Sequence, residues 1–278
     1  MEKDAIQVRP VAAANVLVEV PISYIVLELA DACLADLLAD RHLLAWEERL
    51  LLLRHVVKGV HQMHLQGIVH RDLKSENALV FAIPREGFTT KIADLGRSRD
   101  LNQPVRFVAQ DYLIGRGDWR FAPPEFLWWL GADDPTSFRQ ADLYLLGSVL
   151  FELGTGQGVT SMAFGDVLAV LNATAVLDPA VRAREYRARL SEIRARYAPP
   201  FRLFADEIHL VLRYEAVGLL RQLCDPDPAR RETRFRADRA NGTWGLEWIL
   251  RRIDILRKLA HMNKRAADRS SQRKAVRS

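Results

Sequence analysis

The chain has little cysteine and no long hydrophobic run, and both absences narrow the classes of protein it can belong to. Its 278 residues include two cysteines, Cys33 and Cys224, which lie far apart and belong to no CxxC pair or His/Cys cluster. This argues against a disulfide framework and a zinc site, so we expect two buried thiols in a reducing compartment. No stretch reaches the roughly 18 uncharged apolar residues of a membrane span, and the first ten residues lack the apolar region of a secretory leader. We therefore expect a cytoplasmic protein without a membrane partner.

Strong charge of one sign is missing from most of the chain and is concentrated at its end. The whole chain carries a net charge of +5, yet residues 251–278 hold ten Lys and Arg against Asp254 and Asp268, which leaves about −3 on the first 250 residues. The sequence predicts that residues 263–278 form a basic tail without regular structure. Because this tail has no interleaved aromatic residues, we expect no nucleic-acid partner.

The apolar pattern at the start of the chain predicts a small strand pair and then a helix. Residues 16–20 and 24–29 are rich in β-branched and large apolar residues, and Pro21 separates them, as expected of two short strands joined by a turn. From residue 34 to residue 65 the apolar spacing becomes helical, and Gly67 marks its end.

The rest of the chain predicts one hairpin and a series of helices. Residues 78–81 and 90–92 are β-like and bracket a turn. Residues 142–153 are nearly all apolar and predict a helix that is buried on every side. Residues 246–260 have the spacing of a last amphipathic helix.

One predicted loop combines the side chains that phosphoryl transfer requires. Residues 70–77, with the sequence HRDLKSEN, bring a carboxylate (Asp72), an ammonium (Lys74) and an amide (Asn77) together. A carboxylate can accept the proton of an attacking hydroxyl, and a cation can neutralise charge on the γ-phosphoryl oxygens. An amide oxygen and a second carboxylate can hold Mg²⁺, and Asp94 supplies the second carboxylate. Each residue alone is typical of a turn or a cap, but their joint spacing favours the chemical interpretation.

These segments resemble the protein kinase family, whose HRDLKxxN catalytic loop matches residues 70–77 and whose DFG motif matches Asp94-Leu95-Gly96. Residues 122–125, 142–147 and 227–231 resemble, in family order, the APE, DxWxxG and DPxxR motifs. The resemblance implies an α+β, protein kinase-like fold that is mainly the helical C-lobe. Residues 1–30 would form a remnant of the N-lobe and the hinge, residues 31–262 the C-lobe, and residues 263–278 the tail.

The resemblance also implies ATP-dependent phosphorylation of Ser or Thr on a protein substrate, with ATP and Mg²⁺ as cofactors. Asp72 would be the base or would orient the hydroxyl, and Lys74 would contact the phosphate. Asn77 and Asp94 would be the metal ligands. A lysine two residues after the catalytic aspartate also favours protein substrates over small molecules.

Further roles follow from the resemblance for residues outside the catalytic loop. Glu28, Leu29 and Ala30 would form the hinge whose backbone contacts adenine, and Leu79 would pack beneath the base. Glu125 and Arg231 would form a buried ion pair that anchors the activation segment.

The sequence departs from the family pattern in two places. Only 27 residues precede Glu28, and they contain neither a Gly-rich loop nor the strand lysine that contacts the α- and β-phosphates. Asp118 replaces the threonine that normally bonds the catalytic aspartate and lysine; it could pair with Lys74 but would repel Asp72. Two other interpretations therefore stay open: a kinase-like binding module with impaired catalysis, and a chain whose true start lies upstream. A partner or an upstream segment would then complete the N-lobe.

Overall fold

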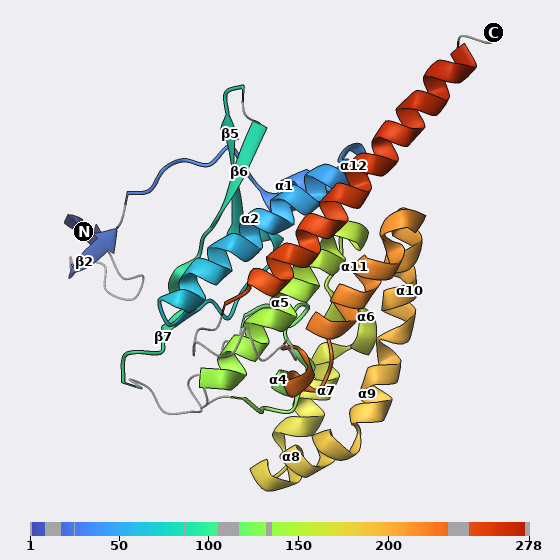
Figure 1. Ribbon diagram of the computed structural model, residues 1–278. Coiled ribbons are helices and arrows are strands. Elements are labelled where there is room, and N and C mark those ends of the chain that lie inside the picture. Colours follow the sequence, from blue (N-terminus) through green and yellow to red (C-terminus); the bar gives the residue numbers. More distant parts are fainter. Residues whose placement is uncertain are drawn as a thin grey trace. The chain divides into compact units, whose positions relative to one another are not determined.

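A computed structural model of the chain describes residues 2–8, 18–24, 26–85, 87–104, 117–131, 135–232 and 245–275. The chain divides into two compact units, Met1–Ala30 and Asp31–Ser278 (Figure 1).

The first unit contains an antiparallel strand pair. Strand β1 (Glu2–Val8) pairs with β2 (Val18–Tyr24), and Glu2 lies opposite Tyr24. Pro21 lies inside β2 rather than in a turn, so the predicted division of this region into two strands at Pro21 is wrong. In an isolated pair each strand has one unpaired edge, which tolerates a residue without an N–H group. Residues 26–30 form no regular element, and residues 16, 17 and 25 lie outside the described residues.

The second unit contains two small antiparallel sheets. Strands β3 (Ala32–Cys33), β5 (Ala78–Ile83) and β6 (Gly87–Ile92) form one sheet in the order β3-β5-β6, and β4 (Ile68–Val69) pairs with β7 (Arg99–Asp100). Ala78 lies opposite Ile92. This register confirms the predicted hairpin, which is longer than the sequence pattern indicated.

Helices make up most of the second unit. They are α1 (Leu34–Ala39), α2 (Trp46–Leu65), α4 (Pro124–Leu127), α5 (Pro135–Thr155), α6 (Val159–Phe164), α7 (Val167–Ala175), α8 (Pro179–Ala188), α9 (Leu190–Arg196), α10 (Ala198–Glu207), α11 (Leu210–Leu223) and α12 (Glu247–Ala275). Short 3₁₀ turns are η1 (Arg41–Leu43), η2 (Ser75–Asn77), η3 (Leu95–Arg97) and η4 (Pro228–Arg230). This mainly helical α+β architecture confirms the predicted fold class.

Helix α2 carries the predicted apolar stripe, and every member of it is buried: Leu50, Leu53, Val57, Val60 and His64. The helix begins after Ala45, whose N–H donates to the Glu48 carboxylate at 2.8 Å. The helical stretch predicted for residues 34–65 is nevertheless interrupted between α1 and α2. The Arg49 guanidinium stabilises the interruption by donating to the carbonyl oxygens of Arg41, Leu44 and Leu153, a set of contacts that apolar spacing cannot reveal.

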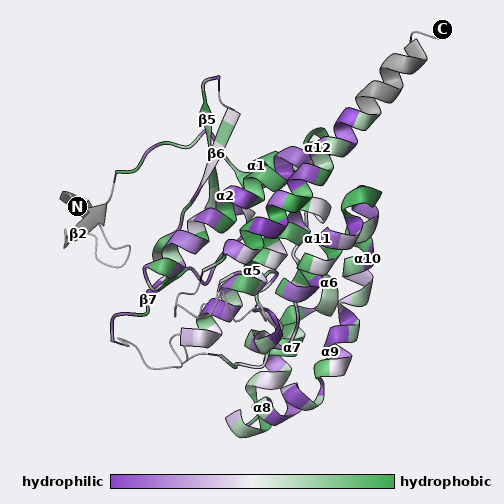
Figure 2. Ribbon diagram, viewed as in Figure 1, coloured by the Kyte–Doolittle hydropathy of each residue, from purple (hydrophilic) through white to green (hydrophobic). Residues whose placement is uncertain are grey.

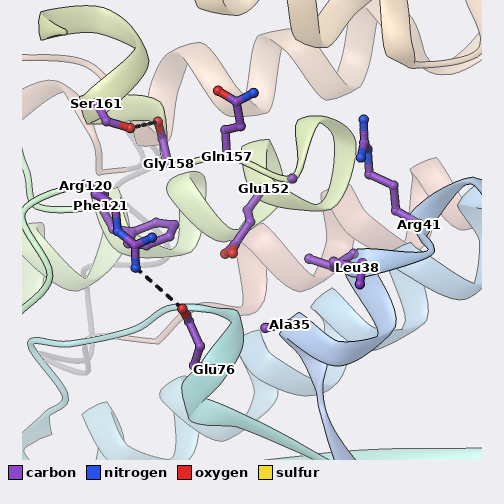
Figure 3. A pocket seen from close by; sticks show the side chains of 12 residues that line it. Ala35, Leu38, Arg41, Glu76, Arg120, Phe121, Glu152, Gln157, Gly158 and Ser161 are labelled. Carbon is purple, nitrogen blue, oxygen red and sulfur yellow. Dashed lines mark hydrogen bonds and ion pairs between the residues drawn. The ribbon is translucent and has the colours of Figure 1, made fainter.

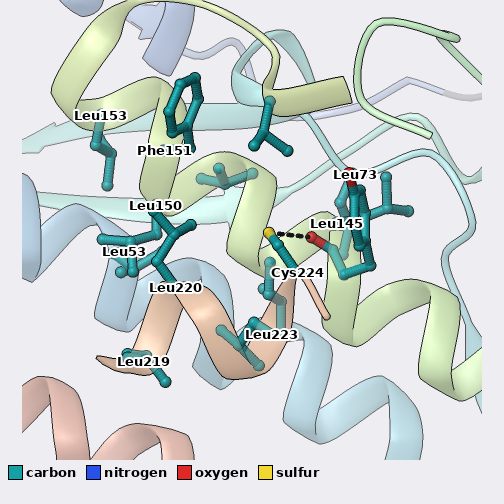
Figure 4. Close-up of a cluster of buried hydrophobic side chains, with 14 of the residues drawn as sticks. Leu53, Leu73, Leu145, Leu150, Phe151, Leu153, Leu219, Leu220, Leu223 and Cys224 are labelled. Atoms are coloured by element: carbon teal, nitrogen blue, oxygen red, sulfur yellow. Dashed lines mark hydrogen bonds between the residues drawn. The ribbon is translucent and has the colours of Figure 1, made fainter. Parts of the chain in front are cut away.

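Helix α5 is the centre of the core, as its nearly all-apolar sequence predicts. Every residue from Gln140 to Thr155 is buried. Leucines of α2, α5 and α11 meet around Cys224 (Figure 4). At Gly147 an added Cβ would lie 2.6 Å from Cys224 Sγ, so the close approach of α5 and α11 depends on this glycine. Of the two thiols that we expected to be buried, Cys224 is buried, whereas Cys33 is only partly buried. Burial raises the pKa of the Cys224 thiol.

Helix α12 lies along α2 (Figure 1). Hydrophobic and hydrophilic positions alternate along both helices, as in amphipathic helices that bury one face (Figure 2). Arg54 and Asp254 link the two helices by an ion pair of 2.7 Å.

Helix α12 continues to Ala275 and includes most of residues 263–278, which we expected to lack regular structure. Alanine, arginine, lysine and glutamine all have high helix propensity. Among the described residues, no helix has the length and apolar character that a bilayer span needs.

Candidate active site

The loop of residues 70–77 connects β4 to β5 and is anchored by Asp142 of α5. The Asp142 carboxylate accepts the N–H groups of His70 and Arg71, both at 2.8 Å, and lies 2.9 Å from Nε2 of His64. Burial alone would raise the pKa of Asp142, but the hydrogen bond and charge of His64 and the two backbone donors lower it. The ionised carboxylate thus fixes the N–H of Arg71, whose φ of 71° lies in the left-handed region.

Asp72 is 7% exposed and lies between two further segments of the chain. Its Oδ1 accepts the N–H of Asp118 at 3.2 Å, and its Oδ2 lies 3.4 Å from Nε of Arg97. Gly117 has a φ of +91°, and a Cβ at this position would lie 2.5 Å from Asp72 Oδ1. The catalytic-loop carboxylate is therefore held against a backbone segment that only glycine can form without strain.

Asn77 and Asp94 are brought together by the β5–β6 hairpin. The N–H of Ala93 donates to the carbonyl of Asn77 at 2.9 Å, which places Asp94 beside the end of the loop. Nδ2 of Asn77 donates to the Asp72 carbonyl at 2.7 Å. Asp94 is exposed and has a left-handed φ of 55°, and its carboxylate accepts the N–H of Gly96 at 3.4 Å.

This pair fits Mg²⁺, which proteins usually hold through one or two carboxylates together with phosphate oxygens and water. Because Nδ2 of Asn77 is used as a donor, its Oδ1 remains an available ligand oxygen. Among the described residues, no group of three or more His, Cys, Asp or Glu forms a metal cluster.

Lys74 is half-buried and lies 3.6 Å from Asp118 Oδ2. The predicted pairing of these two residues is confirmed. Asp118 also accepts bonds from Arg120 at 2.5 and 3.0 Å. Burial raises the pKa of Asp118, but the bonds and charges of Arg120 and Lys74 outweigh burial and lower it. The Asp118 carboxylate therefore stays ionised and faces the Lys74 ammonium.

The residues predicted to bind adenine are divided between the two units. Glu28, Leu29 and Ala30 belong to the first unit, and Leu29 is 92% exposed. Leu79 belongs to β5 of the second unit and is half-buried. Their roles in nucleotide binding stay predictions.

The predicted ion pair between Glu125 and Arg231 is confirmed. Two bonds of 2.7 and 2.6 Å join the guanidinium to the carboxylate, and Arg231 also donates to the carbonyls of Asp225 and Gln140. Burial alone would lower the pKa of Arg231, but Glu125 raises it further above its usual value. This pair fixes the start of α4, and with it the segment that carries Asp118.

A pocket of about 460 Å³ borders the catalytic loop and contains two acidic residues that the sequence analysis did not identify as site residues. Glu152 of α5 points into it, and Glu76 of η2 pairs with Arg120 at 3.6 Å (Figure 3). Burial raises the pKa of Glu152 to about 7, although bonds from the Ser75 hydroxyl and N–H partly oppose the shift. Sequence spacing gives no signal for Glu152, because it lies 76 residues after Glu76.

Arg97 is another residue that the sequence analysis missed. It lies three residues after Asp94, on η3, and its guanidinium is 42% exposed where it approaches Asp72. The carbonyl of Arg97 accepts a bond from Arg71 at 3.3 Å. The only signal in the sequence is a basic residue directly after the Asp-Leu-Gly motif.

The mainly helical lobe thus carries an anchored loop with a carboxylate, an ammonium and an amide, and a hairpin joins this loop to a second carboxylate. The model of the protein kinase domain matches residues 11–243. The chain belongs to the protein kinase domain family.

Individual relatives are distant. Cyclin-dependent kinase F-3 of Oryza sativa subsp. japonica is 30% identical over 218 residues, which are 76% of this chain and 46% of the relative. Cyclin-dependent kinase 8 of Drosophila melanogaster is 33% identical over 39% of this chain and 23% of its own length. A probable serine/threonine-protein kinase, PknB, of Lactococcus lactis is 30% identical over 48% of this chain and 20% of its own length. The chain thus spans less than half the length of these relatives.

Proposed function

We propose that this chain carries the catalytic half of an ATP-dependent protein kinase that phosphorylates Ser or Thr. One observation carries the proposal: Asp72, Asn77 and Asp94 form one cluster through the Asn77–Asp72 bond and the Ala93–Asn77 bond. The three groups come from two segments, and phosphoryl transfer to a hydroxyl needs all of them.

In the proposed mechanism Asp72 accepts the proton of the substrate hydroxyl as that oxygen attacks the γ-phosphorus and ADP leaves. Lys74 neutralises charge on the transferred group. Asn77 and Asp94 would hold Mg²⁺, and the metal would neutralise negative charge on the phosphates of ATP. The bond from Asn77 to the Asp72 carbonyl links the proposed metal ligand to the proposed base. The two residues therefore keep a fixed position relative to each other.

The remaining parts of the proposal follow from family membership. The backbone of residues 28–30 would contact adenine, with Leu79 beneath the base. An upstream segment or a partner would supply the cations and the sheet that cover the phosphates. A cytoplasmic protein with a Ser or Thr residue would be the acceptor.

The test is phosphotransfer from radiolabelled ATP to a generic basic protein or to the chain itself, with and without an Asp72→Asn substitution. We expect the substitution to lower the rate at least about a hundredfold, because general-base catalysis contributes about this much. Binding of Mg²⁺-ATP, measured by calorimetry, should be weak but unchanged, since Asp72 is not a metal ligand in the proposal. Equal rates in the two proteins would remove Asp72 from the mechanism.

A second candidate function is a kinase-like binding module with impaired catalysis. Two contacts favour it: Arg97 is paired with Asp72, and Asp118 is paired with Lys74. Both catalytic groups are therefore engaged by opposite charges of the chain itself. If no phosphotransfer above the Asp72→Asn background is detected, including when a complete N-lobe is added, this second function replaces the first.

A further inference from the structure

A second cavity lies between α2 and β6, away from the base Asp72. Its volume is about 590 Å³, and residues of α2, residues 89–92 of β6 and Leu95 line it. Gly59 permits the close packing of the helix against the strand, because a Cβ at this position would lie 2.7 Å from Ile92 Cγ1. Strand β6 is the last strand of its sheet, so one of its edges is unpaired within that sheet.

The charged residues that line this cavity are all basic. Arg54, Lys58 and Lys91 line the cavity, and no Asp or Glu is among the described lining residues. The Lys91 ammonium, however, lies 4.2 Å from the centroid of the Phe81 ring, which is outside the lining. The nearby carboxylate of Asp254 is shared between Arg54 at 2.7 Å and Arg257 at 3.8 Å. Lys58 is exposed and forms no hydrogen bond or ion pair with any residue that the structure describes.

Two buried polar atoms in the same lining lack hydrogen-bond partners among the described residues. They are Oγ1 of Thr90, a residue that is 6% exposed, and Nδ1 of His55. A buried polar atom without a partner costs free energy. Burial lowers the pKa of His55, and the charges of Arg54, Arg257 and Lys58 lower it further. A ligand with negative charge and several acceptor oxygens would relieve both penalties.

We infer that this cavity is a binding site for a phosphoryl group. A phosphoryl group carries a charge near −2 and three strong acceptor oxygens. It would match the Lys58 ammonium, which has no partner among the described residues, and the unpartnered hydroxyl of Thr90 better than a carboxylate would, because a carboxylate has one charge and two oxygens. The group would belong to a small phosphate ester or to a phosphorylated side chain of a protein. This site is separate from the proposed nucleotide site and does not depend on phosphotransfer.

The test follows the histidine ring of His55 by NMR in the full chain labelled at histidine, assigned with a His55→Asn variant. Titration with inorganic phosphate at constant ionic strength should give a saturable shift of this resonance. The pKa of His55 should rise on saturation, because a nearby anion favours the imidazolium form.

Lys58→Gln should weaken phosphate binding about tenfold or more, since a charge-assisted bond is lost, and Thr90→Val should weaken it less. Lys264→Gln, a change of an exposed lysine of α12 outside the cavity, should have no effect.

The source of the group is distinguished with a phosphothreonine peptide and its unphosphorylated form. Binding of the phosphopeptide at least about tenfold tighter than phosphate, with no binding of the plain peptide, assigns the site to a phosphorylated protein. Equal or weaker binding of the phosphopeptide assigns it to a small phosphate. The inference is overturned if chloride at the same ionic strength reproduces the shift, if the shift does not saturate, or if Lys58→Gln binds phosphate as tightly as the parent chain.

Discussion

Gly117 and Asp72 lie so close that the position of the Asp72 carboxylate depends on the absence of a side chain at residue 117. Any other residue at position 117 would be destabilised for two independent reasons. Its backbone would be strained at a φ of +91°, and its Cβ would lie only 2.5 Å from Asp72 Oδ1. The segment from Gly117 to Asp118 also donates the N–H that orients Asp72. A substitution at residue 117 would therefore displace the Asp72 carboxylate, the base in the proposed mechanism, without replacing it by another chemical group.

Gly117→Ala should destabilise the fold by about 1 kcal/mol or more from the backbone strain alone. It should also lower any phosphotransfer roughly a hundredfold, because a displacement of a catalytic group by about 1 Å has this effect. Thermal melts and initial rates measure the two effects. Gly165→Ala is the matched control, since Gly165 has a φ of +65° with nothing within 4 Å; it should lose stability but keep activity. Loss of activity in both variants would contradict the role of the Gly117 contact.

Glu152 gives the fold a pH dependence that can be measured. Its pKa of about 7 lies above the ordinary value of 4.5 because the carboxyl is buried. Between these two values the folded chain retains a proton that the unfolded chain has released. The free energy of unfolding therefore falls as the pH rises from about 4.5 to about 7, by up to about 3 kcal/mol.

Glu152→Gln should remove this contribution, since the amide is neutral and its oxygen can still accept the Ser75 N–H. The variant should match the parent chain near pH 5 and be more stable than it near pH 8. Urea unfolding at the two pH values tests this. Glu192→Gln, on the surface of α9, should leave the pH dependence as it is. A parent chain and a Glu152→Gln variant with parallel stability profiles would show that Glu152 titrates normally.

At the scale of whole elements, α5 determines where the loop of residues 70–77 lies. Asp142 in its first half fixes the catalytic loop, and Glu152 near its end fixes Ser75. The helix is itself held by close contact with α11 at Gly147. Packing of two helices in the core therefore sets the positions of two separate parts of the loop.

Gly147→Ala should destabilise the chain by about 1–3 kcal/mol, because the added methyl would lie 2.6 Å from Cys224 Sγ and 2.7 Å from Leu223 Cβ. Chemical denaturation gives the value. Gly218→Ala on α11 is the control: its Cβ would meet only the tip of Arg252, at 3.3 Å, so the change should be neutral or slightly stabilising. Equal stability of the Gly147→Ala variant and the parent chain would mean that α5 and α11 can move apart to admit the methyl group without losing stability.

At the scale of the molecule, the bond between Glu125 and Arg231 joins parts of the chain that are 106 residues apart. Both side chains are almost fully buried. A broken buried pair leaves one charge without a partner, which costs far more than the intact pair contributes.

Arg231→Met should therefore destabilise the fold by about 3–5 kcal/mol, whereas Arg231→Met combined with Glu125→Leu should recover much of the loss. Thermal and urea unfolding of the single and double variants measure this. Arg230→Met, which removes the neighbouring exposed arginine, is the control and should have little effect. A double variant no more stable than Arg231→Met would contradict this explanation.

The sequence alone determined the protein family and the fold class. Local spacing was sufficient for the stripe of α2, the buried helix α5 and the β5–β6 hairpin, because helix and strand periods depend on near neighbours. The motif spacing was sufficient to propose site roles for Asp72, Lys74, Asn77 and Asp94, and these roles stay predictions. It did not reveal the break between α1 and α2, or the course of β2 through Pro21, since distant carbonyls and the partner strand decide these.

Only the tertiary structure decided which charges surround those residues. Arg97 beside Asp72, Asp118 on Lys74, and the buried Glu152 with its raised pKa all result from contacts across turns or across many residues of sequence. The phosphoryl cavity between α2 and β6 likewise arises from residues that are about 30 positions apart, which meet because Gly59 admits the strand. Electrostatic interactions depend on distance and burial in three dimensions, and neither is encoded in the local pattern of residues.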